Sequence, residues 1–186
     1  MLKNILYGNP ILSRWKFSDI CYLYENFSAM KITLLAIGKT NAKYLQDGIE
    51  QYTKRLSHYV PFEFKILPDV KTTKGLTQEK QKEMEGEMFL NAIQAGDVVV
   101  LLDERGKEFT SRDFATYIDK KMVTVAKNLI FVIGGPYGFS KAMYDRANEK
   151  LSLSKMTFSH EMIRLFFIEQ IYRAMTILKG EPYHHD

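Results

Sequence analysis

The sequence of 186 residues contains a single cysteine, Cys21, and no long run of apolar residues. One cysteine cannot close a disulfide within the chain or build a zinc site of several cysteines, which excludes disulfide-stapled domains and zinc ribbons. No segment approaches the roughly 18 to 20 consecutive apolar residues that a membrane helix needs, and the N-terminus lacks the features of a signal peptide. We therefore expect a cytoplasmic protein without a membrane span.

The composition is that of a globular domain. Hydrophobic residues make up 46% of the chain and charged residues 26%, which excludes a disordered or collagen-like chain. The length fits one domain with an appendage and suffices for a hydrophobic core. A net charge of +4 permits contact with nucleic acid without requiring it.

Residues 1–29 differ in character from the rest of the chain. Asn9-Pro10 interrupts them, their aromatic residues follow no period, and Met30 then opens a strand-like pattern. They are either a true N-terminal extension or upstream sequence translated from an early start codon, and we favour the second interpretation. Without them the remaining chain, 30–186, carries a net charge of +3 and is expected to form a single domain.

Short apolar runs alternate with helical patterns from residue 30 onward. This alternation is typical of an α/β domain with a largely parallel sheet flanked by helices. The third and fourth apolar runs are nearly continuous, as expected of central strands that are covered on both faces. Strands are predicted at 31–37, 62–67, 97–102, 128–133 and 150–154, and helices at 42–57, 77–95, 111–125 and 160–179.

A glycine-rich turn, GGPYG (Gly134–Gly138), follows the fourth predicted strand. Ligands bind outside the carboxyl ends of strands in open α/β sheets, and glycines let backbone amides approach them. The alternative is an ordinary strand-to-helix turn. Pro136 breaks the GxGxxG pattern, and Leu101 stands where a Walker A loop needs glycine, so a dinucleotide dehydrogenase and a P-loop NTPase are disfavoured.

Two further segments at strand ends are candidates for the same crevice. The segment LSLSKMTFS (Leu151–Ser159) mixes hydroxyl and apolar side chains, which suits a flat heteroaromatic ligand; the alternative is a capped loop. Leu102 ends the third predicted strand and can line a pocket. We interpret the stretch that follows, with the adjacent carboxylates Asp103 and Glu104, as a solvated turn rather than a metal or acid–base site.

His160 and Arg164 are spaced to share one face of the last predicted helix. Arg164 replaces the second histidine of an HExxH motif, which excludes that type of zinc protease. Arginine suits phosphate binding, and a purely structural role is the alternative. Glu169 and Arg173 have the spacing of an ordinary helix ion pair. The adjacent histidines of the C-terminal tail are either frayed or an adventitious metal site.

Four segments together resemble one known family. They are LLDERGKEFTS (101–111), FVIGGPYGF (131–139), LSLSKMTFSHEMIRLFFIEQIYRA (151–174) and GEPYHH (180–185). These segments closely resemble the ribosomal RNA large subunit methyltransferase H family within the SPOUT class, and MKITLLAIGK (30–39) is similar to that family's N-terminus. The resemblance spans 30–186. Ser159 is a local departure from the family pattern, because some relatives have proline at this position. Either residue can begin a helix.

The resemblance implies a SPOUT-type fold with a C-terminal trefoil knot, a rare exception to unknotted topology. It further implies a homodimer that transfers a methyl group from S-adenosylmethionine to N3 of a pseudouridine in 23S rRNA of the assembled ribosome, without a metal. The implied cofactor contacts fall on Leu102, Gly134, Leu153, Ser154, Lys155, Met156, Thr157 and Phe158.

For this reaction we expect direct displacement at the sulfonium methyl, after the weakly acidic imide N3 has lost its proton. We expect Arg164 to hold RNA phosphate or to stabilise the deprotonated imide, and His160, Tyr183 and His184 to assist proton removal. The long apolar helix from His160 is the expected dimer face, and the alternative is that its apolar stripe is ordinary core. The alternatives are a catalytically silent RNA-binding module and a metal-assisted hydrolase that uses Asp103, Glu104 and His160.

Overall fold

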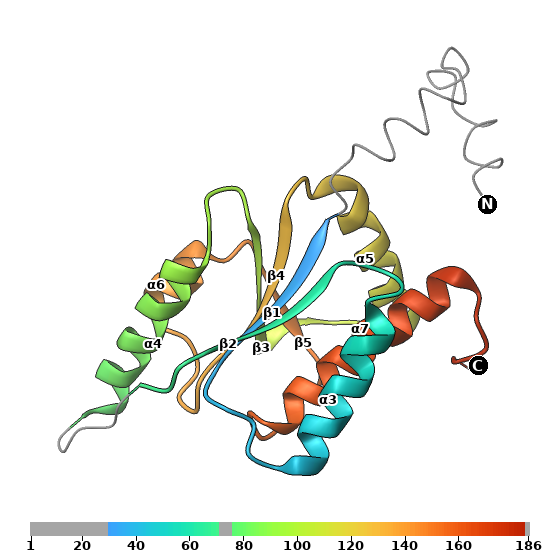
Figure 1. Ribbon diagram of the computed structural model, residues 1–186. Helices are drawn as coiled ribbons and strands as arrows, with labels where there is room; N and C mark the ends of the chain where they lie inside the picture. Colours follow the sequence, from blue (N-terminus) through green and yellow to red (C-terminus); the bar gives the residue numbers. More distant parts are fainter. Residues whose placement is uncertain (1–29, 71–75, 185–186) are drawn as a thin grey trace.

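The computed structural model describes residues 30–70 and 76–184 and shows one sheet with helices on both faces (Figure 1). The prediction for residues 1–29 lies outside the described residues. The sheet has the strand order β2-β1-β4-β3-β5, and every neighbouring pair is parallel. This confirms the predicted α/β class. The strands are β1 (Lys31–Ile37), β2 (Phe62–Leu67), β3 (Val98–Glu108), β4 (Asn128–Ile133) and β5 (Glu149–Ser152).

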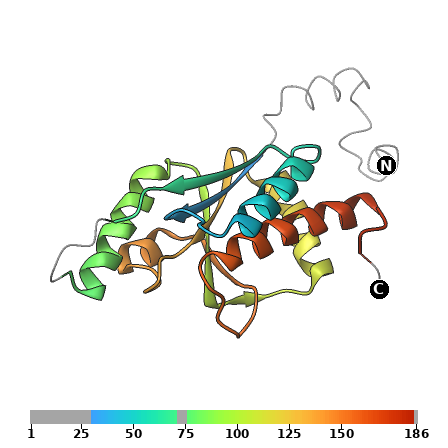
Figure 2. The same ribbon diagram turned by 60° about the horizontal axis from the view of Figure 1, so that its bottom comes forward.

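Two helical layers cover the sheet. Figures 1 and 2 show α4 and α6 on one side, and α3, α5 and α7 on the other. Residues alternate between the two cores along β4, with Phe131 packed toward α5 and α7, and Val132 toward α4 and α6. A strand buried on both faces needs apolar residues at every position, which explains the unbroken run. The helices are α3 (Lys43–Leu56), α4 (Gln78–Ala92), α5 (Ser111–Thr124), α6 (Lys141–Arg146) and α7 (Met162–Lys179).

Hydroxyl side chains begin three of the helices. Thr77, Thr110 and Ser140 each accept a hydrogen bond from the backbone amide three residues further on, at the start of α4, α5 and α6. Helix α6, which sequence reasoning missed, has only six residues. The last helix, α7, ends at Gly180, whose φ of 67° is the left-handed conformation that favours glycine.

Strand β3 runs further than predicted. It continues past Leu102 to Glu108, and Leu151 of β5 pairs with both Leu102 and Lys107. The residues between those two pairings therefore bulge from the ladder. The predicted turn is thus part of a strand, although Glu104 is exposed to solvent as expected. A Cβ atom on Gly106 would lie 2.4 Å from the carbonyl carbon of Leu151, so the close crossing requires glycine. The trefoil knot stays a prediction.

Candidate active site

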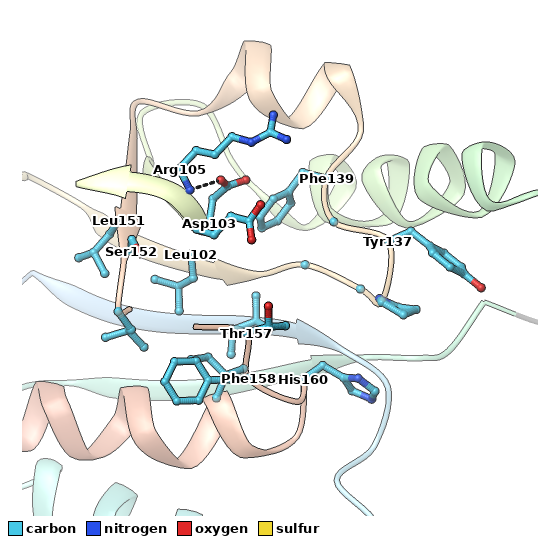
Figure 3. Close-up of a pocket in the computed structure, with 18 of the residues that line it drawn as sticks. Leu102, Asp103, Arg105, Tyr137, Phe139, Leu151, Ser152, Thr157, Phe158 and His160 are labelled. Carbon is cyan, nitrogen blue, oxygen red and sulfur yellow. Dashed lines mark hydrogen bonds between the residues drawn. The ribbon is translucent and has the colours of Figure 1, made fainter. Parts of the chain in front are cut away.

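The bulged middle of β3 and the carboxyl ends of β4 and β5 surround one cavity of about 680 Å³, within the range of small-molecule sites. Figure 3 shows Leu102, Thr157, Phe158 and His160 around it, while Tyr137 points away from its centre. The predicted cofactor residues Leu102, Gly134, Leu153, Ser154, Met156, Thr157 and Phe158 all line the cavity. Lys155 is not among the lining residues, and its side chain is exposed.

The GGPYG turn forms one wall of the cavity. It is closed by a hydrogen bond of 3.1 Å from the amide of Gly138 to the carbonyl of Gly135. Gly138 has a φ of 81°, which glycine adopts without strain. The absence of side chains at Gly134 and Gly135 leaves backbone atoms on the cavity surface.

The segment after β5 forms the opposite wall. The Ser152 hydroxyl donates to the carbonyl of Ser154 at 3.0 Å, and the Ser154 hydroxyl accepts from the amide of Met156 at 3.0 Å. These two hydroxyls therefore fix the shape of the loop itself. The rings of Phe158 and Phe166 lie 5.5 Å apart, and both are more than one third exposed.

Asp103 stands on the cavity wall with both carboxylate oxygens engaged. Oδ1 accepts from the amide of Arg105 at 2.8 Å, and Oδ2 accepts from the hydroxyl of Tyr144 at 2.5 Å. Burial, and then this hydrogen bond, raises the pKa of Tyr144 to about 12, so the phenol keeps its proton. Sequence reasoning missed Tyr144 because it lies on α6, a helix too short to show a periodic pattern.

His160 and Arg164 diverge in spite of their helical spacing. His160 lines the cavity, whereas Arg164 is 1% exposed and donates from Nη2 to the carbonyl of Ile37 at 2.7 Å. Its Nη1 donates to the carbonyl of Gly38 at 2.7 Å and to the hydroxyl of Thr40 at 2.9 Å. Burial lowers the pKa of Arg164. This geometry favours the structural alternative, because the guanidinium faces the end of β1 and offers no surface to a phosphate.

Tyr183 and His184 lie beyond the far end of α7. A helix of 18 residues spans about 27 Å, so these side chains are remote from His160 of the same chain. The Tyr183 hydroxyl lies 3.0 Å from that of Tyr52 and donates to Oε1 of Glu169 at 3.0 Å. The Glu169–Arg173 ion pair, at 2.6 Å, is confirmed. Tyr183 is therefore held in place rather than frayed.

The metal-assisted alternative would need a group of side chains arranged to bind a metal ion. Asp103, Glu104 and His160 all line the cavity, but within residues 30–70 and 76–184 no group of three or more His, Cys, Asp or Glu side chains is arranged to hold a metal ion. Across the same residues, no helix is long and apolar enough to cross a membrane.

Comparison with known proteins places this architecture in a family. The model of a family described as predicted SPOUT methyltransferase matches residues 30–184. The protein named ribosomal RNA large subunit methyltransferase H in Parabacteroides distasonis is 64% identical over 157 residues, which are 84% of this chain and 100% of that protein. The proteins of the same name in Christiangramia forsetii and Bacteroides fragilis are 60% and 57% identical; the matches cover 84% of this chain and 99% and 100% of those proteins.

These matches extend over the whole sheet, both helical layers and every wall of the cavity. The chain belongs to the SPOUT methyltransferase family, among the ribosomal RNA large subunit methyltransferase H proteins.

Proposed function

We propose that this protein methylates N3 of a pseudouridine in 23S ribosomal RNA on the assembled ribosome in the cytoplasm, with S-adenosylmethionine as donor. The names of its relatives support a large-subunit rRNA substrate. The observation that carries the proposal is that three separate segments, the middle of β3 at Leu102 and the ends of β4 and β5 at Gly134 and Ser152, line a single cavity.

The cavity fits an adenosyl donor. SPOUT methyltransferases use S-adenosylmethionine, which supplies a methyl group made electrophilic by the sulfonium. Leu102, Leu153 and Phe158 offer apolar surface for a flat ring, and the GGPYG turn offers backbone atoms for hydrogen bonds. We assign the cofactor contacts to Leu102, Gly134 and the segment from Leu153 to Phe158, with Lys155 contributing through its backbone.

His160 is the candidate that removes the imide proton, because it is the histidine on the cavity wall. General-base catalysis by a positioned side chain typically contributes about 10² to 10⁴-fold. Positioning of the two reactants accounts for more, on the order of 7 to 11 kcal/mol. No metal takes part in this scheme. Arg164 acts as a positioning residue that ties the start of α7 to the end of β1.

We further propose a homodimer whose contact includes the start of α7. Phe158 and Phe166 border a hollow of about 260 Å³ that is lined by apolar side chains (Phe109, Phe114, Leu151, Leu153) and polar ones (Thr110, Ser111, Ser152, Gln170). Burial of exposed aromatic rings against a second copy stabilises such a dimer. Because Tyr183 and His184 are remote from His160 of their own chain, any catalytic role for them is exercised at the cavity of the partner.

The test combines calorimetry with methylation of ribosomes that lack the modification. Wild-type protein should bind S-adenosylmethionine and transfer its labelled methyl group to one nucleotide of the large-subunit RNA. His160→Ala should lower kcat at least about 100-fold, while exposed His58→Ala serves as the matched control. Absence of heat on titration with S-adenosylmethionine would instead favour the RNA-binding module.

A further inference from the structure

Glu85 is an acidic residue buried in the face of α4 that packs on the sheet. It is 3% exposed, and the other buried residues of this helix are Gly86 and Phe89. A carboxyl group removed from water is normally matched by hydrogen bonds or a counter-charge. Its place in the fold therefore needs an explanation that hydrophobic packing does not supply.

The partners of Glu85 leave one oxygen unused. Oε1 accepts a hydrogen bond from Nε2 of Gln81 at 2.9 Å. Oε2 is buried and has no hydrogen-bond partner among the residues that the structure describes. It instead packs against Gly135, the second residue of the GGPYG turn.

The contact with Gly135 leaves no room for a side chain. A Cβ atom at residue 135 would lie 2.1 Å from Oε2 and 2.6 Å from Cδ of Glu85. The φ of Gly135 is outside the left-handed region, so its backbone conformation does not demand glycine. The carboxyl group of Glu85 is thus the group that a side chain at residue 135 would have to displace.

The neighbouring residue of α4 repeats the close approach. A Cβ atom on Gly86 would lie 2.1 Å from the hydroxyl oxygen of Ser140, and Ser140 begins α6. Helix α4 therefore packs against both ends of the segment from Gly135 to Ser140. Gly135 itself lines the cavity and Glu85 does not, so the carboxyl group supports the turn from behind.

We propose that Glu85 is a positioning residue for cofactor binding, whose carboxyl group fixes the shape that the GGPYG turn presents to S-adenosylmethionine. This inference rests on the proposed function. Glu85 touches neither the cavity nor a reacting atom, and it acts through Gly135. It extends the site to a residue in the helical layer behind the cavity wall.

The surroundings favour a role for the shape of the side chain over a role for its charge. Burial raises the pKa of Glu85, an effect that the hydrogen bond from Gln81 and the nearby His160 oppose and that Asp69 reinforces. The neutral carboxyl group is thereby favoured relative to an exposed glutamate. Glutamine has nearly the same shape and no charge, whereas aspartate keeps the charge but is one methylene too short to reach Gly135.

The first experiment measures the Kd of S-adenosylmethionine by calorimetry for variants at residue 85. Glu85→Ala and Glu85→Asp should each raise the Kd about tenfold or more, and Glu85→Gln should stay within about threefold of wild type. Exposed Glu87→Ala on the same helix is the matched control. With ribosomes as substrate, Glu85→Asp should raise the KM for S-adenosylmethionine with little change in kcat.

The second experiment tests the contact itself with a double-mutant cycle. Gly135→Ala should weaken binding about tenfold or more, because its methyl group and the buried carboxyl group of Glu85 cannot both keep their places, and adding Glu85→Ala should recover about threefold or more of that loss. The proposal would be overturned if the increases in Kd of the two single variants multiply in the double variant. It would also be overturned if Glu85→Asp binds S-adenosylmethionine as tightly as wild type. If Glu85→Ala does not fold, the Kd values of Glu85→Gln and Glu85→Asp still test the proposal. Failure of the wild-type protein to bind would refute the proposed function instead.

Discussion

Nη1 of Arg164 donates a 2.7 Å hydrogen bond to the carbonyl oxygen of Gly38, 126 positions earlier in the chain. With the bond from Nη2 to the carbonyl of Ile37, this contact anchors the first turn of α7 to the carboxyl end of β1. His160 stands in the turn that precedes α7, and the Leu153–Phe158 segment leads into that turn. Both contribute residues to the wall of the cavity. Arg164 therefore fixes the start of the helix that follows these residues, and it does not line the cavity itself.

Replacement of Arg164 by methionine should destabilise the fold by about 3 kcal/mol, because buried carbonyl oxygens lose their donors. Lysine, which has a single ammonium group, should recover only part of that loss. Urea unfolding measures the change, with exposed Lys120→Met as a control that should stay within about 0.5 kcal/mol of wild type. A methionine variant as stable as wild type would show that the three hydrogen bonds contribute nothing net.

Glu161 anchors the same turn to the start of α3. Its carboxylate accepts from the amide of Asn41 at 3.0 Å and from that of Ala42 at 3.4 Å, and α3 has no side-chain cap of its own. The hydrogen bond from the Asn41 amide is the main cause that lowers the pKa of Glu161 from 4.5. A lowered pKa means that the folded state favours the charged form.

The contribution of Glu161 to stability should therefore be complete above pH 4.5 and should disappear as the pH falls through the lower value of the folded protein. At pH 7, Glu161→Gln should melt at a lower temperature than wild type. The difference should shrink as the pH falls below 4.5. Thermal unfolding across pH 3 to 7 (about the range in which carboxylates titrate) measures it, with Glu87→Gln as the exposed control. A pH-independent difference would contradict the assignment.

The elements that sequence reasoning placed well are those with a local cause. The unbroken apolar run of β4 follows from burial on both faces, and the N-cap of α5 at Thr110 is visible in the sequence. The apolar residues of α7 likewise recur at helical spacing, and that pattern can be recognised without knowledge of a distant partner. Such elements are readable because the residues that determine them are neighbours in the chain.

The features that sequence reasoning missed depend on distant contacts. The extension of β3 exists because β5 returns to pair with Lys107. The role of Arg164 depends on carbonyl groups of β1, and that of Glu85 depends on a glycine 50 positions later. Spacing along a helix placed His160 and Arg164 together, but it could not show that the guanidinium turns toward the sheet.

Gly106→Ala should damage the site through the backbone. The added methyl group would lie 2.4 to 2.7 Å from three backbone atoms of Leu151, and a backbone contact cannot be relieved by a change of rotamer. The expected loss is about 3 kcal/mol or more. Leu151 precedes the Leu153–Phe158 segment, to which we assign cofactor contacts. The Kd of S-adenosylmethionine should therefore rise as well.

Gly138→Ala is the informative comparison for that variant. Nothing lies within 4 Å of its added methyl group, and only the φ of 81° opposes it, at about 1 to 2 kcal/mol. Denaturant unfolding ranks the two variants. Equal losses of unfolding free energy in the two variants would mean that the backbone shifts at the crossing of β3 and β5 at a lower cost than the short distances indicate.

Mixed dimers provide the test of whether Tyr183 acts at the partner's cavity. In the proposed dimer, the His160→Ala and Tyr183→Phe variants should each methylate ribosomes poorly, since each lacks one group at both sites. In a heterodimer, one cavity would combine an intact His160 with the intact Tyr183 of the other chain. Random exchange of subunits should therefore restore about one quarter of wild-type activity. Activity that remains at the level of the separate variants would restrict catalysis to His160 and the cavity of its own chain.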